Sequence, residues 1–153
     1  MVAAIRPDDW NLFLFLHVLG AMLLLGALTL AAVSLAAAWR DGTLASTRLG
    51  YRALLLAAIP GWLLMRIFGE VIAAKEKLGD LPTDPTWLTI GYITSEPGLL
   101  LLIVATVLAG LRMRRSRRGE GGGPGLDRAA TLLVGVMLVA YVVALWAMTT
   151  KPT

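Results

Sequence analysis

The chain has 153 residues, a net charge of +4 and no cysteine; 58% of its residues are hydrophobic and 16% are charged. Soluble domains average about 45–50% apolar and about 25% charged residues, so this composition argues against an ordinary soluble or disordered protein. The lack of cysteine excludes disulfides and thiolate metal sites, and the single histidine excludes a two-imidazole site within one chain. The length suits one domain, covering residues 1–153.

Four segments are long and apolar enough to cross a bilayer, which takes roughly 20 apolar residues per helix. Backbone polar groups must be paired within the segment in lipid, and the absence of period-two alternation predicts helices rather than barrel strands. The expected fold class is therefore all-α, an integral membrane four-helix transmembrane bundle. Its spans are predicted at about residues 12–39, 53–74, 85–111 and 129–148.

The first span, 12–39, contains one titratable residue, His17. Its apolar run is longer than the roughly 7–15 residues of a signal-peptide core, so we interpret it as a retained span. At 3.6 residues per turn, His17 shares a face with small residues, which mark helix–helix contacts in membranes. We therefore expect His17 to point into the bundle. The residues on this face are Gly20, Ala27, Ala31, Ser34 and Ala38.

The second span, 53–74, carries Arg66 and Glu70. Their spacing of four residues allows an ion pair on one helix face. Pro60 precedes them and is expected to kink the helix, because proline lacks the backbone N–H that the helix needs.

The third span, 85–111, carries Tyr92, Ser95 and Glu96 and is expected to be interrupted near Pro97. A broken helix with polar side chains at membrane depth is a common way to build a site. The fourth span, 129–148, is uncharged, and Tyr141 is its main polar residue.

The arginines between the spans predict the orientation of the chain, because cytoplasmic connections are enriched in Lys and Arg. Nine arginines lie in the first and third connections, against four basic residues on the other side. This split predicts an N-out/C-out protein of the plasma (bacterial inner) membrane, with a flexible cytoplasmic loop at 112–127. A run in that loop is expected to contact anionic lipid rather than nucleic acid: Arg112, Arg114, Arg115, Arg117 and Arg118.

The main polar groups of all four spans fall in the half predicted to be outer, which indicates an outward-facing polar pocket. Each group also has a purely structural explanation. Arg66 and Glu70 can neutralise each other, and His17 can hydrogen-bond a neighbouring helix. Glu96 can cap a helix that begins at Pro97, or it can be protonated and paired. The pocket candidates are His17, Arg66, Glu70, Tyr92, Ser95, Glu96 and Tyr141.

Several functions remain open for such a pocket. His17 with Met22 and Met65 is a candidate copper set, and His17 alone a candidate haem ligand, although no ligand spacing motif is present. A small ligand is the third possibility. No catalytic residues are expected, because nothing marks a nucleophile. The alternatives are an accessory subunit of a larger membrane complex, a homo-oligomer, and proton-linked transport of a small solute.

The opening span, NLFLFLHVLGAMLLLGAL at 11–28, resembles the first span of the copper-resistance protein D-like group of bacterial membrane proteins. It is particularly similar to a family in that group described as predicted integral-membrane proteins of unknown function. The similarity covers most of the chain at the level of four spans. The residues that carry it are Leu16, His17, Gly20, Gly26, Ile59-Pro60-Gly61 and Lys151-Pro152.

Relatives in the wider group include copper-transport proteins and a haem-containing protoporphyrinogen oxidase, so the resemblance implies that His17 is a functional ligand. The chain departs from both. The oxidase-like members pair their histidine with a lysine in a later span, whereas no span here contains lysine. The copper-handling members are larger and richer in His and Met. We therefore assign neither copper transport nor the oxidase activity to this chain.

Overall fold

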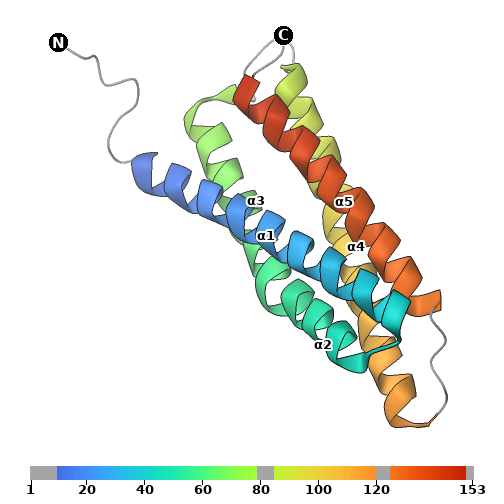
Figure 1. Ribbon diagram of the computed structural model, residues 1–153. Coiled ribbons are helices and arrows are strands. Elements are labelled where there is room, and N and C mark those ends of the chain that lie inside the picture. The colour runs from blue at the N-terminus through green and yellow to red at the C-terminus, as the bar shows by residue number, and fades with distance from the viewer. Residues whose placement is uncertain (1–9, 79–84, 120–124, 151–153) are drawn as a thin grey trace.

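The structure of the protein is a computed structural model, which describes residues 10–78, 85–119 and 125–150. The regular elements in these ranges are helices, arranged as a bundle (Figure 1). In chain order they are α1 (Asn11–Asp41), α2 (Leu44–Ala53), the π-helical turn η2 (Leu54–Ala58), α3 (Ile59–Lys75), α4 (Thr86–Arg117) and α5 (Gly125–Thr150).

Four helical stretches are long and apolar enough to cross a membrane, which confirms the predicted number of spans. They are Asn11–Asp41, Leu44–Lys75, Thr86–Arg117 and Gly125–Thr150. The second of them joins α2, η2 and α3 without a break. A multi-pass membrane protein is the class that this arrangement fits.

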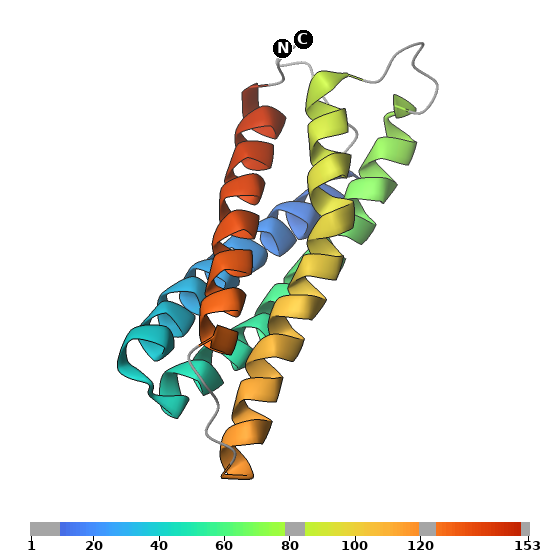
Figure 2. The same ribbon diagram turned by 90° about the vertical axis from the view of Figure 1, so that its right-hand side faces the viewer.

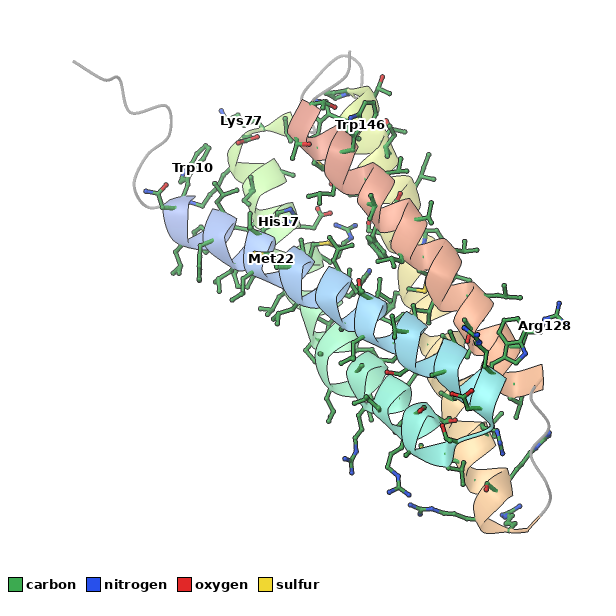
Figure 3. All side chains as sticks on the ribbon, viewed as in Figure 1. Trp10, His17, Met22, Lys77, Arg128 and Trp146 are labelled. Atoms are coloured by element: carbon green, nitrogen blue, oxygen red, sulfur yellow. The ribbon has the colours of Figure 1, made fainter. Side chains whose placement is uncertain are left out.

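The two ends of the bundle differ in their side chains. Figure 3 shows Trp10, Lys77 and Trp146 at one end, where α1 begins and α5 ends, and Arg128 at the other. We call the first the terminal end. The second, where α4 ends in its arginine run, is the arginine end; there the Arg128 guanidinium lies 5.5 Å from the centre of the Trp39 ring.

The first connection is much shorter than predicted. Gly42 ends α1 in the left-handed region, at φ 68°, and its N–H bonds the Ala38 carbonyl at 2.8 Å. A helix starts again at Leu44, so Arg48 lies on α2 rather than in a loop. The physical reason is a buried face of small residues, which packs α2 against α1. This face comprises Thr47, Gly50 and Ala53.

The two prolines lie in different helical surroundings, and the kink expected at Pro60 stays a prediction. Ahead of Pro60 the helix widens into the π-helical turn, in which the Ile59 N–H bonds the Leu54 carbonyl. Pro60 then falls in the first turn of α3, where a missing N–H is tolerated. The predicted interruption of the third span is wrong, because α4 continues through Pro97, which lies on an exposed face.

The backbones of α1 and α3 approach each other closely where the two helices cross. A Cβ atom on Gly20 would lie 2.4 Å from the Met65 backbone nitrogen, and one on Gly61 would lie 2.8 Å from the Leu24 nitrogen. The face of α1 predicted to be buried is buried at all five of its small residues, from Gly20 to Ala38. Glycine therefore sets the position of α3 against the helix that carries His17.

The predicted loop 112–127 is wrong at both of its ends. α4 continues to Arg117 and α5 begins at Gly125, while residues 120–124 of the glycine-rich segment lie outside the described residues. Arg112 is buried, and its Nε donates to Asp127 Oδ2 at 3.0 Å. The hydroxyl of Thr47 donates to the other Asp127 oxygen at 3.1 Å. Burying this carboxylate requires both donors, and they join α2, α4 and α5.

The helices separate toward the terminal end. α1 runs obliquely across the bundle: its second half packs beside α5, whereas its start lies apart from the end of α5 (Figures 1 and 2). α3 packs against α1, and α4 packs against α5. These two helix pairs diverge in the half of the molecule that contains His17.

Candidate functional site

A cavity of about 390 Å³ occupies the space between the two helix pairs. All four membrane-length helices contribute to its wall, and most of the lining residues are apolar. Three of the apolar lining residues are largely exposed, namely Val18 and Met22 of α1 and Leu145 of α5. The cavity therefore borders the apolar surface that would face lipid.

His17 projects from α1 into this space (Figure 3). Its Nδ1 lies 2.7 Å from the Met65 carbonyl oxygen, and its ring packs over Gly69, where a Cβ would lie 3.0 Å from Nδ1. A carbonyl only accepts hydrogen bonds, so Nδ1 carries the proton. In the neutral ring, Nε2 then presents a lone pair.

Arg66 is the centre of a charged cluster on the wall formed by α3 and α4. It forms the predicted ion pair with Glu70, one turn later on α3. It also reaches α4, where its Nη2 lies 3.5 Å from Glu96 Oε1 and its guanidinium carbon 4.9 Å from the centre of the Tyr92 ring. The cluster thus contains one cation and two carboxylates.

A neutral polar group lies deeper in the same half. The Trp62 Nε1 donates to the Ser95 carbonyl at 3.0 Å, which links α3 to α4. Ser95 Oγ donates weakly to the Tyr92 carbonyl at 3.4 Å. Tyr141 of α5 is buried, and its Oη packs against Gly98 with no hydrogen-bond partner in the part of the chain that the structure describes.

Six of the seven predicted pocket residues line this one cavity. The seventh, Glu96, does not line the cavity and is joined to it through Arg66. Trp62 was missed; its signal in the sequence is an indole in the middle of an apolar span, which needs a hydrogen-bond acceptor when buried. The six lining residues are His17, Arg66, Glu70, Tyr92, Ser95 and Tyr141.

The predicted copper set is only partly assembled. His17, Met22 and Met65 all line the cavity, but His17 bonds the backbone of Met65, and Met22 is among the most exposed apolar side chains. Among residues 10–78, 85–119 and 125–150, no three His, Cys, Asp or Glu side chains are grouped to hold a metal ion. The binding of copper or haem stays a prediction, in which His17 Nε2 would be the imidazole ligand.

The arginine run is divided between two roles. Arg112 is buried in its ion pair with Asp127, so it is not available for the lipid contact expected of it. The remaining members of the run are exposed at the arginine end, and their contact with anionic lipid stays a prediction. They are Arg114, Arg115, Arg117 and Arg118.

Comparisons with protein-family models, curated proteins and solved structures found no match to this chain. The resemblance of its first span to the copper-resistance protein D-like group therefore stays a prediction.

Proposed function

We propose that this protein is a multi-pass protein of the bacterial inner membrane, with both termini outside, that binds a small hydrophobic molecule carrying one polar end. The ligand's apolar body occupies the cavity between α1, α3, α4 and α5. Its polar end lies against the wall formed by His17, Arg66 and Glu70. The arginine distribution supports the orientation, because the arginine end then lies in the cytoplasm.

The observation that carries this proposal is the make-up of the cavity. Small-molecule sites have volumes of about 300–1,000 Å³, with mostly apolar walls and a few polar groups that fix the ligand's orientation. The cavity here has about 390 Å³, an apolar wall and its charged groups on one side. Exposed apolar side chains of α1 and α5 border it, which gives a hydrophobic ligand a route from the lipid.

Binding of 1-adamantanol tests the proposal, because this probe has a compact apolar cage and a single hydroxyl. Equilibrium dialysis compares nanodiscs of zwitterionic lipid that contain the protein with empty nanodiscs. We expect saturable binding of one molecule per chain. Equal uptake by empty and protein-containing nanodiscs would contradict the proposal.

A pair of variants on α1 locates the bound probe. Ala21 lines the cavity, so Ala21→Trp fills it and abolishes binding. Ala36 has a similar half-buried environment but lies outside the cavity lining, so Ala36→Trp retains binding. Binding that persists in Ala21→Trp would place the probe elsewhere and overturn the assignment.

A further inference from the structure

We propose that a groove between α2 and α4 is a second binding site, which holds one molecule of an anionic phospholipid. An acyl chain of the lipid occupies the groove, and the phosphate lies against arginines of the same two helices. This inference goes beyond the proposed function, because the groove shares no lining residue with the cavity next to His17. Three features carry it: an open apolar groove, an arginine on each helix at its end, and a shortage of acids to pair with those arginines.

The groove has a volume of about 340 Å³ and lies where α2, η2 and the start of α3 pass α4. Its lining residues Leu55, Ile103 and Val107 are 39%, 45% and 52% exposed, so the groove is open at the surface of the bundle. The Thr106 hydroxyl in its wall already donates to the Leu102 carbonyl at 2.7 Å. The wall therefore offers a ligand mainly hydrocarbon, which suits an acyl chain.

Each of the two helices carries an arginine about one turn beyond the groove. Arg48 lies three residues before Tyr51 on α2, and Arg114 lies four residues after Gly110 on α4. Residues three or four apart share a helix face, and both arginines are exposed. A Cβ on Gly110 would lie 3.3 Å from the Tyr51 ring, so these two faces are adjacent. Because α2 begins and α4 ends at the arginine end (Figures 1 and 2), both arginines belong to the same end of the groove.

Few acids are present to balance these arginines. Arg48 and Arg114 have no ion-pair partner in the part of the chain that the structure describes. Segments 40–52 and 112–128 of the sequence contain nine arginines and three acids, and one of these acids, Asp127, is already held in its buried pair. A phosphate supplies the missing negative charge, and guanidinium groups bind phosphate through two parallel hydrogen bonds.

A phospholipid fits this face better than a second copy of the chain. Two-fold symmetry brings the same surface of both copies together, so Arg48 and Arg114 would meet their own equivalents and repel them. An anionic phospholipid has hydrocarbon for the groove and a phosphate for the arginines. Basic pockets between membrane-spanning helices are known sites for such headgroups.

Native mass spectrometry tests the proposal with two lipids that share their acyl chains. The protein in mild detergent is mixed with equal amounts of dioleoylphosphatidylglycerol, which is anionic, and dioleoylphosphatidylcholine, which is zwitterionic. We expect each chain to retain one phosphatidylglycerol, with a preference of about tenfold over phosphatidylcholine. Equal retention of the two lipids, or a dimer without bound lipid, would overturn the inference.

Two arginine variants test the charged end of the site. Arg48→Gln and Arg114→Gln each remove one cation beside the groove, so each should lower the preference for phosphatidylglycerol severalfold. Arg40→Gln is the matched control, since Arg40 is exposed at the end of α1, which does not line the groove. A preference that all three variants leave unchanged, or that all three lower equally, would contradict a site at these two helices.

Two valine variants test the acyl-chain end. Val107 lines the groove, so Val107→Trp fills it and should abolish lipid retention. Val136→Trp should retain the lipid, because Val136 is an exposed valine of α5 outside the groove. Lipid that persists in Val107→Trp would overturn the assignment to the groove.

Two further measurements separate this site from a headgroup-only site and from the first cavity. Glycerol 3-phosphate has the phosphate without the chains, so at equal concentration it should not displace the lipid; displacement would contradict the role of the groove. Ala21→Trp fills the cavity next to His17 and should leave lipid retention unchanged. Loss of the lipid in Ala21→Trp would place it in that cavity and overturn the second site.

Discussion

Gly20 lies where the backbones of α1 and α3 nearly touch, and its lack of a side chain is a requirement of the crossing. A Cβ there would lie 2.4 Å from the Met65 nitrogen and 2.8 Å from the Gly61 oxygen. Both are backbone atoms, which cannot move without displacing α3. We expect Gly20→Ala to lower the free energy of unfolding by about 1–3 kcal/mol, the usual effect of overpacking, as measured by steric trapping in bicelles.

Gly26 provides the matched control on the same helix. No heavy atom lies within 4 Å of a Cβ built at this glycine, and alanine is favoured over glycine in a helix by up to about 1 kcal/mol. Gly26→Ala should therefore be neutral or stabilising. If Gly20→Ala is equally harmless, the close crossing is wrong.

The pair formed by Arg112 and Asp127 gives a second residue-scale prediction. Both side chains are buried, and Thr47 bonds the same carboxylate. Arg112→Met leaves that carboxylate without its cation, so we expect a loss of about 3–5 kcal/mol in the free energy of unfolding. The double variant Arg112→Met, Asp127→Leu should lose less. A double variant as unstable as the single one would rule out this pairing.

The sequence predicts charged pairs only when they are local. Arg66 and Glu70 lie one helical turn apart, so their pairing follows from spacing. Arg112 and Asp127 lie on different helices, and their pairing depends on how α4 and α5 meet. The same limit applies to Glu96, whose contact with Arg66 needs the α3–α4 packing.

At the scale of elements, an indole hydrogen bond helps to link α3 to α4 in the cavity half. Trp62 Nε1 donates to the Ser95 carbonyl at 3.0 Å, and both residues are buried. We expect Trp62→Phe to lower the free energy of unfolding by about 0.5–1.5 kcal/mol for the lost hydrogen bond. Thermal unfolding in detergent measures the effect.

Trp146 is the corresponding control, because it is exposed on α5. Trp146→Phe should leave the unfolding temperature unchanged. Equal unfolding temperatures for the two variants would argue against the α3–α4 link.

Helices that cross the membrane are predictable from the sequence, whereas their ends and connections are less so. Apolar runs alone predict the four spans that the structure contains. Apolar runs do not predict α2, because Arg48 and Arg52 interrupt its apolar pattern. One face of α2, formed by small residues, is nevertheless buried. The extension of α4 to Arg117 was not predicted for the same reason. Arginine is a good helix former, but a prediction from hydropathy alone assigns an arginine-rich segment to a connection between spans.

At the scale of the whole molecule, the orientation can be measured cleanly because the chain has no native cysteine. Asn11 is exposed at the terminal end and Arg115 at the arginine end. We expect a membrane-impermeant maleimide to label Asn11→Cys in intact spheroplasts. Arg115→Cys should react only after the membrane is permeabilised. The opposite pattern would invert the orientation and place the cavity toward the cytoplasm.

The most direct test of the central claim is the protection of a cysteine in the cavity wall. Ala73 lines the cavity, whereas Ala37 does not. In spheroplasts, an impermeant thiol reagent should modify Ala73→Cys and leave Ala37→Cys unmodified. When 1-adamantanol is present at about ten times its Kd, about a tenth of the cavities stay empty, so modification of Ala73→Cys should slow about tenfold. An Ala73→Cys rate that 1-adamantanol does not change would contradict an outward-facing, ligand-binding cavity.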